Sequence, residues 1–382
     1  MARFTIKKCL RHFDDDLLKQ YFEYKNISKE FPERTKKVKS IDIQDWFDYI
    51  NGLDNANDIN LDFREIYQLA DESGIFAIIE LAREKASSFL QDIQSIENDY
   101  NKSLFCFLKY PSLFKNASIL HYVTELKSKK ERINLKTVKN IDDVLSKKQE
   151  LTEAVSVYYQ SEDGRGKNCT IDDCIYEDRV CFIVYIEDFM KSYLQHEKGK
   201  LVRKTSIPTF EIVYVYYNQI GRLELSGGNI GSKKELDLFN IFNQVVLEDK
   251  KAVATLQKVY DFDKFLLDKE FELENDIDNK FDYIIVKQMR LSHKFDKNKR
   301  IIFEQDVEGG LKPMLDLLEQ HKIDKNKFNL TQVVINIKFP GKGNRGSVAM
   351  KLTYPDRCNL SDSPSNLKAK KYIKKWKLEI NP

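Results

Sequence analysis

The chain has 382 residues, of which 42% are hydrophobic and 12% aromatic, so it has enough apolar side chains for a packed core and is not intrinsically disordered. A single compact core usually takes up roughly 150 to 200 residues, which is about half of this chain, so we expect two folded units. The formal net charge of +3 indicates no acidic partner by itself, and no apolar run approaches about 18 residues. We therefore expect a cytoplasmic protein with neither a secretion signal nor a membrane partner.

Apolar residues recur at helical spacing from residue 14 to residue 117. Ile43, Trp46, Phe47 and Ile50 form one apolar face, and Gly52 follows as a helix end. Further helices are expected over residues 75–85, 87–100 and 102–108, with another that ends near Gly74. This pattern predicts an all-helical domain over residues 1–127.

Residues 128–150 contain two lysine-rich clusters and few large apolar side chains. We interpret this segment as a linker or hinge. The glutamate and lysine of Glu125-Leu-Lys127, just before it, match the E-x-K string of metal-dependent nucleases, in which a strand presents both side chains. Such strings also arise by chance in a chain rich in lysine and glutamate, so this hypothesis is the weaker one.

Beyond the linker the apolar period changes towards two, which is typical of strands. Strands are expected over residues 154–160, 179–188, 209–217, 222–225, 283–291 and 301–305. Ser232-Lys-Lys-Glu235 matches a capping box that opens a helix, and another helix is expected over residues 310–318. The sequence thus predicts an α+β fold, with a mostly antiparallel sheet and a few packed helices over residues 151–382.

Cysteines and acidic residues cluster between residues 163 and 181. Cys169, Cys174 and Cys181 are spaced more widely than the cysteine pairs of structural zinc sites, and we expect all six cysteines of the chain to be reduced thiols. The carboxylates around them are interpreted as a solvated acidic loop; they are Asp163, Asp172, Asp173, Glu177 and Asp178. The sequence therefore predicts no cofactor and no metal ligand.

A glycine string, Gly341-Lys-Gly-Asn-Arg-Gly346, matches the dinucleotide-binding fingerprint in letters only. Alternating apolar residues flank it on both sides, over residues 331–339 and 347–354, so it joins two strands as a hairpin turn. Without a helix after it, the string has no helix N-terminus to bind a pyrophosphate. The glycines at 227, 228 and 231 precede a predicted helix, and weak anion binding there is a second possibility.

Positive charge is concentrated at the C-terminal end. Residues 340–382 contain ten lysines or arginines and three acidic residues, a balance of +7. Ser363 and Pro364 begin a predicted helix whose apolar face contains Tyr372 and Trp376, and we expect six lysines to face outwards. The residues predicted to bind nucleic acid are Lys342, Arg345, Lys368, Lys371, Lys374 and Lys375. An ordinary amphipathic helix and a membrane-surface helix remain alternatives.

Two stretches, Tyr354-Pro-Asp-Arg-Cys-Asn-Leu360 and Tyr372-Ile-Lys-Lys-Trp-Lys-Leu378, resemble the closing signature of an uncharacterised family of bacterial proteins of about this length. The resemblance implies no activity. It adds only the expectation that the two halves of the chain belong together.

No convergent set of catalytic residues stands beside the basic terminus. We therefore expect a non-catalytic binding or assembly component of a bacterial multi-protein system, such as a phage-defence or mobile-element operon, with protein partners and with nucleic acid as the acidic partner. A metal-dependent nuclease with its site in the sheet-bearing half and a protein-only scaffold remain alternatives. The sequence does not indicate the oligomeric state.

Overall fold

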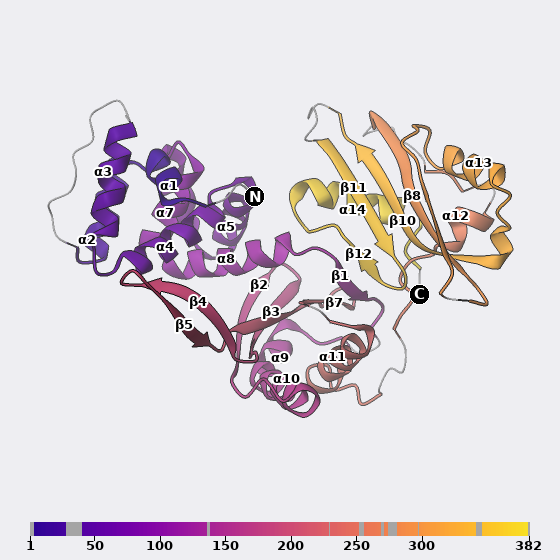
Figure 1. Cartoon of the computed structure of the whole chain (residues 1–382), viewed down its shortest axis with the longest axis horizontal. Coiled ribbons are helices and arrows are strands. Elements are labelled where there is room, and N and C mark those ends of the chain that lie inside the picture. The colour runs from indigo at the N-terminus through magenta and orange to yellow at the C-terminus, as the bar shows by residue number, and fades with distance from the viewer. Residues whose placement is uncertain are drawn as a thin grey trace. The chain divides into compact units, whose positions relative to one another are not determined.

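The structure is a computed structural model (Figure 1). It describes residues 4–27, 40–135, 138–228, 230–251, 256–268, 271–273, 281–296, 298–340 and 346–380. The chain divides into two compact units, Met1–Thr124 and Glu125–Pro382. The first is helical and the second contains a ten-stranded antiparallel sheet, so the predicted α+β class is confirmed.

The first unit consists of helices joined by short connections. They are α1 (Ile6–His12), α2 (Asp15–Tyr24), α3 (Ser40–Asn51), α4 (Ala56–Leu69), α5 (Glu72–Lys85), α6 (Ser87–Asp92), the 3-10 turn η1 (Ile93–Ser95), α7 (Asp99–Lys109) and α8 (Pro111–Glu125). Aromatic side chains fill its core, and Tyr21, Phe22, Trp46 and Phe63 are almost completely buried. The predicted apolar face of α3 thus packs inwards.

Side-chain caps set several helix boundaries that periodicity alone misplaced. The Asn98 side chain accepts a hydrogen bond from the Asn101 backbone N–H and begins α7, so the single helix expected over residues 87–100 is wrong. Asp71 caps α5 in the same way, and Gly74 lies inside the first turn of that helix rather than ending α4. A Cβ atom at Gly74 would lie 2.5 Å from the Leu69 backbone, which explains why glycine occupies the position.

The second unit is built on one sheet with the strand order β2-β3-β6-β7-β1-β12-β11-β10-β8-β9. Its strands are β1 (Lys129–Arg132), β2 (Cys169–Tyr176), β3 (Arg179–Glu187), β6 (Thr209–Tyr217), β7 (Arg222–Gly227), β8 (Tyr283–His293), β9 (Arg300–Glu304), β10 (Phe328–Lys338), β11 (Ser347–Thr353) and β12 (Arg357–Cys358). Strands β4 (Lys191–Glu197) and β5 (Lys200–Ser206) pair with each other in a separate two-stranded ribbon. The hairpin predicted around residues 218–221 is confirmed by the pairing of β6 with β7. The strands predicted on either side of residues 341–346 also pair, as β10 with β11, while residues 341–345 themselves lie outside the described residues.

Helices lie on the sheet of the second unit (Figure 1). They are α9 (Ile141–Ser146), α10 (Lys148–Asp163), α11 (Ser232–Val245), α12 (Asp263–Leu267), α13 (Lys312–Gln320), the 3-10 turn η2 (Lys325–Lys327) and α14 (Pro364–Lys375). The strand expected over residues 154–160 is wrong, because Leu151, Val155 and Tyr159 form one buried stripe of α10 at helical spacing. Among the described residues, no helix is long and apolar enough to cross a bilayer.

The segment expected to be a linker, residues 128–150, holds β1, α9 and the start of α10. β1 lies in the middle of the sheet, between β7 and β12. All four of its residues are charged and buried. A run of charges without apolar residues indicated an exposed connection, and only the strand's neighbours show that it is interior.

Two apolar clusters cover the sheet, and they meet at β1. One cluster joins β3, β6 and β7 to α10 and α11, and it lies on the face that carries Tyr216 and Leu223. The other joins β8, β10 and β11 to α13 and α14, and it lies on the face that carries Leu352 and Cys358. The register pairs Lys130 with Leu225 and Lys129 with Cys358, so the two clusters are on opposite faces. Neither apolar cluster continues unbroken across β1, and charged side chains fill both of its faces.

Candidate functional site

The β1 strand supplies the centre of a buried charged network. The exposed fractions of Lys129, Lys130, Glu131 and Arg132 are only 2–6%. Buried charges are tolerated when each has a partner, since burial otherwise costs several kcal/mol. Alternation along the strand directs Lys129 and Glu131 towards the face with α14, and Lys130 and Arg132 towards the face with α11.

On the α14 face, Lys129 contacts two carboxylates and Lys370 contacts one of them. The Lys129 Nζ atom lies 3.0 Å from Glu224 Oε2 and also contacts Asp362. The Lys370 Nζ atom lies 2.6 Å from Asp362 Oδ1. Burial by itself raises the pKa of Asp362, but Lys129 and Lys370 outweigh it and hold that pKa well below its usual range. Asp362 is therefore held in its ionised form by the two lysines.

Glu131 has a different environment on the same face. The Tyr260 hydroxyl donates to Glu131 Oε1 at 3.2 Å, and the nearest cation, Arg222, lies 3.8 Å away. Arg222 forms its closer ion pair with Glu379. Burial raises the pKa of Glu131, and Arg222 only partly opposes this. A carboxyl group with a raised pKa beside a tyrosine hydroxyl is able to exchange a proton. The cations and carboxylates around Glu131, however, already balance one another's charge.

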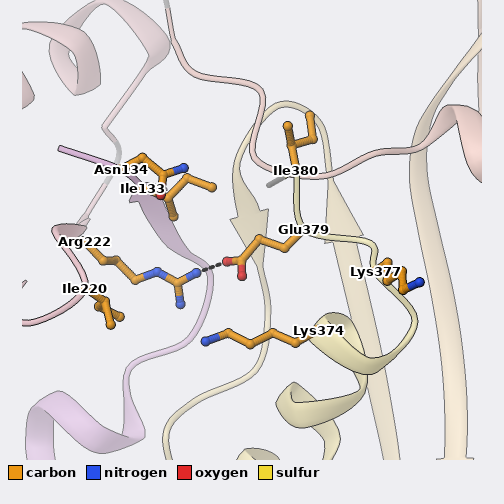
Figure 2. A pocket seen from close by; sticks show the side chains of 8 residues that line it. All are labelled: Ile133, Asn134, Ile220, Arg222, Lys374, Lys377, Glu379 and Ile380. Carbon is orange, nitrogen blue, oxygen red and sulfur yellow. Dashed lines mark ion pairs between the residues drawn. The ribbon is translucent and has the colours of Figure 1, made fainter. Parts of the chain in front are cut away.

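A cavity of about 280 Å³ opens next to this network, between β7 and α14. Its charged lining residues are Glu131, Arg179, Arg222, Glu224, Asp362, Lys370, Lys371, Lys374 and Glu379. A second hollow of about 260 Å³ continues from it and shares Arg222, Lys374 and Glu379. Figure 2 shows Lys374 extending beside the Arg222–Glu379 ion pair in this second hollow. Five cations and four carboxylates line the first cavity, so its interior is nearly neutral.

The exposed side of α14 is strongly basic. Lys368, Lys371, Lys374 and Lys375 all lie on the surface, as does Lys377 just after the helix. The helix contains no acidic residue. One expectation is wrong, because Lys370 does not face outwards with the other lysines. It points into the sheet, where Asp362 neutralises it. Ser363 occupies the N-cap position as expected, but its side chain makes no capping hydrogen bond.

The other predicted residues of the basic terminus, Lys342 and Arg345, lie outside the described residues. The structure therefore brings together four of the six predicted nucleic-acid contacts, which are Lys368, Lys371, Lys374 and Lys375 on α14.

On the α11 face, β1 meets a second set of buried charges. The Lys130 Nζ atom lies 3.0 Å from Glu235 Oε2, and an Arg357 guanidinium nitrogen lies 3.3 Å from the same oxygen. The capping box expected from Ser232 and Glu235 is therefore wrong: the N-cap is Gly231, and Glu235 points into the sheet. Asp356 is completely buried beside Glu235, and neither of its carboxylate oxygens has a hydrogen-bond donor among the described residues. Burial and the Glu235 carboxyl together raise the pKa of Asp356 to about 8.

The motifs considered for metal chemistry do not assemble. Glu125 is the last residue of α8 and Lys127 follows it outside any strand, so the strand-borne E-x-K pair is absent. Asp172 and Asp173 belong to β2 rather than to an acidic loop, and Asp173 pairs with Lys148. Within the described ranges, no three histidine, cysteine or carboxylate side chains are placed to hold a metal ion. Cys169, Cys174 and Cys181, like the other cysteines, are free thiols.

Sequence reasoning missed most of the network residues. Arg222 and Glu224 alternate with leucines on β7, Glu131 lies within the all-charged β1, and Tyr260 lies in an irregular segment. The one available signal was the run Lys129–Arg132, in which four charges precede Ile133 without a glycine or proline. Such a run indicates a buried strand only once its partners are known. No protein-family model and no curated protein matches the chain, so the resemblance of the C-terminal stretches stays a prediction.

Proposed function

We propose that this chain is a binding component that contacts nucleic acid through the exposed side of α14. The observation that carries the proposal is a stripe formed by Lys368, Lys371 and Lys374, with Lys375 beside it, on a helix without acidic residues. Residues three and four positions apart share a helix face, so these ammonium groups are neighbours. A polyphosphate backbone is the partner whose charge repeats at a comparable spacing.

The helix is held in one orientation by its other side. Ala369, Tyr372 and Trp376 are buried in the apolar cluster on the sheet, and Lys370 is tied to Asp362. The lysine stripe is thus presented by a rigid scaffold, and binding does not need to order the helix first. This distinguishes it from lysines on an irregular tail.

The neighbouring cavity does not supply the attraction. Apart from Lys371 and Lys374 at its rim, three cations and four carboxylates line the cavity, whereas these two lysines have no carboxylate partner among the described residues. The positive potential outside the protein therefore arises from the stripe. Contacts of this kind neutralise phosphates and carry no sequence information.

The proposal is tested by exchanging charges on the stripe. In the variant Lys368→Gln/Lys371→Gln/Lys374→Gln we expect the affinity for short oligonucleotides to fall at least about tenfold at moderate salt. The slope of log affinity against log salt concentration should become shallower by about 2 to 3, since each phosphate contact that forms releases about 0.9 counterion and three such contacts are removed. Fluorescence anisotropy with the full chain measures both quantities.

A matched control loses the same charge elsewhere on the second unit. Lys294, Lys312 and Lys322 are exposed and lie far from α14 in the sequence. The triple glutamine variant at these positions should keep the affinity and the salt dependence of the unchanged chain. Equal losses in both variants would mean that only net charge matters, and the proposed site would be wrong. The partner proteins and the multi-protein setting expected from the sequence stay predictions.

A further inference from the structure

The ribbon formed by β4 and β5 stands outside the ten-stranded sheet (Figure 1). Each of its strands has seven residues, and they pair antiparallel from Lys191 with Ser206 to Glu197 with Lys200. At about 3.3 Å per residue the ribbon is about 23 Å long. It is inserted between β3 and β6, which are adjacent in the sheet, so it extends from their common end.

The ribbon is basic. Residues 190–207 contain five cationic side chains and one carboxylate, Glu197, which gives a net charge of +4 with His196 neutral. Lys191 is paired with Asp188 at the base, and Lys204 with Glu197. Lys198 and Lys200 at the turn have no carboxylate partner among the described residues. Two lysines without a carboxylate partner among the described residues thus lie at the tip, away from the sheet.

The two sides of the ribbon differ. The alternation of the strands puts Ser192, Leu194 and His196 on one side, opposite Thr205, Arg203 and Leu201. All six are exposed, Leu194 to 56% and Leu201 to 58%, and the side has no acidic residue. The other side holds Glu197 with Lys191, Lys200 and Lys204; only Val202 and Lys204 on it are half-buried, and its other residues are exposed. We call the first side the open side.

The base of the ribbon is held firmly. Arg165 is 2.6 Å from one Asp188 carboxylate oxygen, and Lys191 is 2.8 Å from the other. The Arg165 guanidinium also lies 4.2 Å from the ring centroid of Phe210 and 5.3 Å from that of Phe189. These contacts hold the direction in which the ribbon leaves the sheet. A ribbon held at its base can present its open side without the cost of ordering it.

We infer that the open side of the β4–β5 ribbon enters the major groove of duplex DNA. That groove is about 12 Å wide and admits a two-stranded ribbon, and its depth of about 8.5 Å is well within the ribbon's reach. Arg203 matches the paired acceptors of guanine, Ser192 and Thr205 can bond to any base edge, and the two leucines fit thymine methyl groups. Lys198 and Lys200 at the turn then lie against phosphates.

Two other occupants fit less well. A second copy of the ribbon would bring two surfaces of charge +4 together, which is unfavourable. The major groove of an RNA duplex is too narrow and deep for side chains to reach the bases. The ribbon therefore deepens the proposed function by naming the class of nucleic acid, and it rests on that function only in requiring a nucleic-acid partner.

The test compares two charge changes on opposite sides of the ribbon. We expect Arg203→Gln to weaken binding to a pool of short DNA duplexes about tenfold or more, because it removes a base contact. Lys204→Gln removes the same charge from the other side, where Glu197 already neutralises it, and should weaken binding less than about threefold. The unchanged chain should prefer the DNA pool over RNA duplexes and single strands of the same sequences, and Arg203→Gln should lose most of this preference. Thermal unfolding of both variants checks that the ribbon's exposed substitutions leave the fold intact.

The outcomes separate this inference from the proposed function. If Arg203→Gln and Lys204→Gln bind DNA equally well, or if the unchanged chain binds RNA duplexes as tightly as DNA, the ribbon does not read the groove. If in addition the α14 lysine variant loses binding to every nucleic acid, the proposed function stands without the inference. If only Arg203→Gln loses binding, the inference stands and the α14 site is wrong. If the unchanged chain binds no nucleic acid, both are wrong.

Discussion

The two faces of β1 hold nearly the same residue types and behave in opposite ways. On the α14 face, Lys129 and Lys370 both contact Asp362, and the pKa of Asp362 is lowered. On the α11 face the cations contact Glu235 instead, and Asp356 is left beside that carboxylate with its pKa raised to about 8. The difference teaches that the position of one carboxylate relative to the cations decides its protonation, and composition does not.

This difference has a consequence for stability. The carboxylate on the α14 face stabilises the fold as an ion, whereas the carboxyl on the α11 face destabilises the fold when it ionises. Removing the charge of the carboxyl group should therefore lower the stability at Asp362 and raise it at Asp356.

The largest effect is expected from Lys129→Met. This change leaves Glu224 without its cation and removes one of two cations from Asp362, inside the sheet. Because breaking a buried ion pair leaves an uncompensated charge, we expect the free energy of unfolding to fall by about 3–5 kcal/mol, as measured by urea denaturation. Adding Glu224→Gln should restore part of the loss. A loss below about 1 kcal/mol would show that the network is not buried in solution.

The next prediction concerns the opposite face. The pKa of Asp356 is about 8 in the folded chain and about 3.9 when unfolded, so the stability of the unchanged protein should fall as pH rises from about 4 to 8 and then level off. Asp356→Asn keeps the shape and a hydrogen-bond donor towards Glu235 but cannot ionise. We expect it to be more stable than the unchanged chain above pH 8, by roughly 2–5 kcal/mol, and this advantage to vanish towards pH 4. Thermal and urea unfolding across this pH range measure the difference.

Asp362→Asn is the matched control, with the opposite sign. The pKa of Asp362 is lowered by its two lysines, so its contribution is present above the unfolded pKa and disappears only as pH falls towards the folded pKa. This variant should be less stable than the unchanged chain at neutral pH, and the deficit should shrink in acid. If both asparagine variants shift stability in the same direction, the contrast between the two faces is wrong.

The smallest effect sharpens the comparison within α14 itself. Lys370 and Lys371 are adjacent in sequence, but Lys370 is tied to Asp362 and Lys371 is exposed. We expect Lys370→Met to lower the free energy of unfolding by about 1–3 kcal/mol. Lys371→Met should change it by less than about 0.5 kcal/mol but weaken oligonucleotide binding. Urea unfolding measures the stability of the two variants, and fluorescence anisotropy measures their binding. An equal loss of stability in both variants would contradict the prediction.

Much of the fold was predictable wherever a segment carries its own period. The alternation in residues 209–225 and 331–354 predicted two hairpins whose pairing the structure confirms. The prediction of secondary structure failed where the residue types favoured one element and the spacing of the apolar residues favoured another. Val155 and Tyr159 favour strands by type, but their spacing places them on one face of α10.

The candidate site was predictable only in part. The lysine-rich helix was visible because its charges are consecutive in sequence, and Lys368, Lys371, Lys374 and Lys375 are on its exposed side. The charged network beneath it was not visible. Its members come from β1, β7, α14 and the residues on either side of α14, and Lys129 and Asp362 are separated by 233 positions.

By itself, the sequence determined the helical first unit, the antiparallel second unit and the basic terminal helix, because neighbouring residues along the chain specify period and charge. Only the tertiary structure decided that β1 is interior and that Lys370 turns inwards while Lys371 does not. The physical reason is that burying a charge depends on partners contributed by distant strands, and one residue's step along a helix or strand changes which partners it meets.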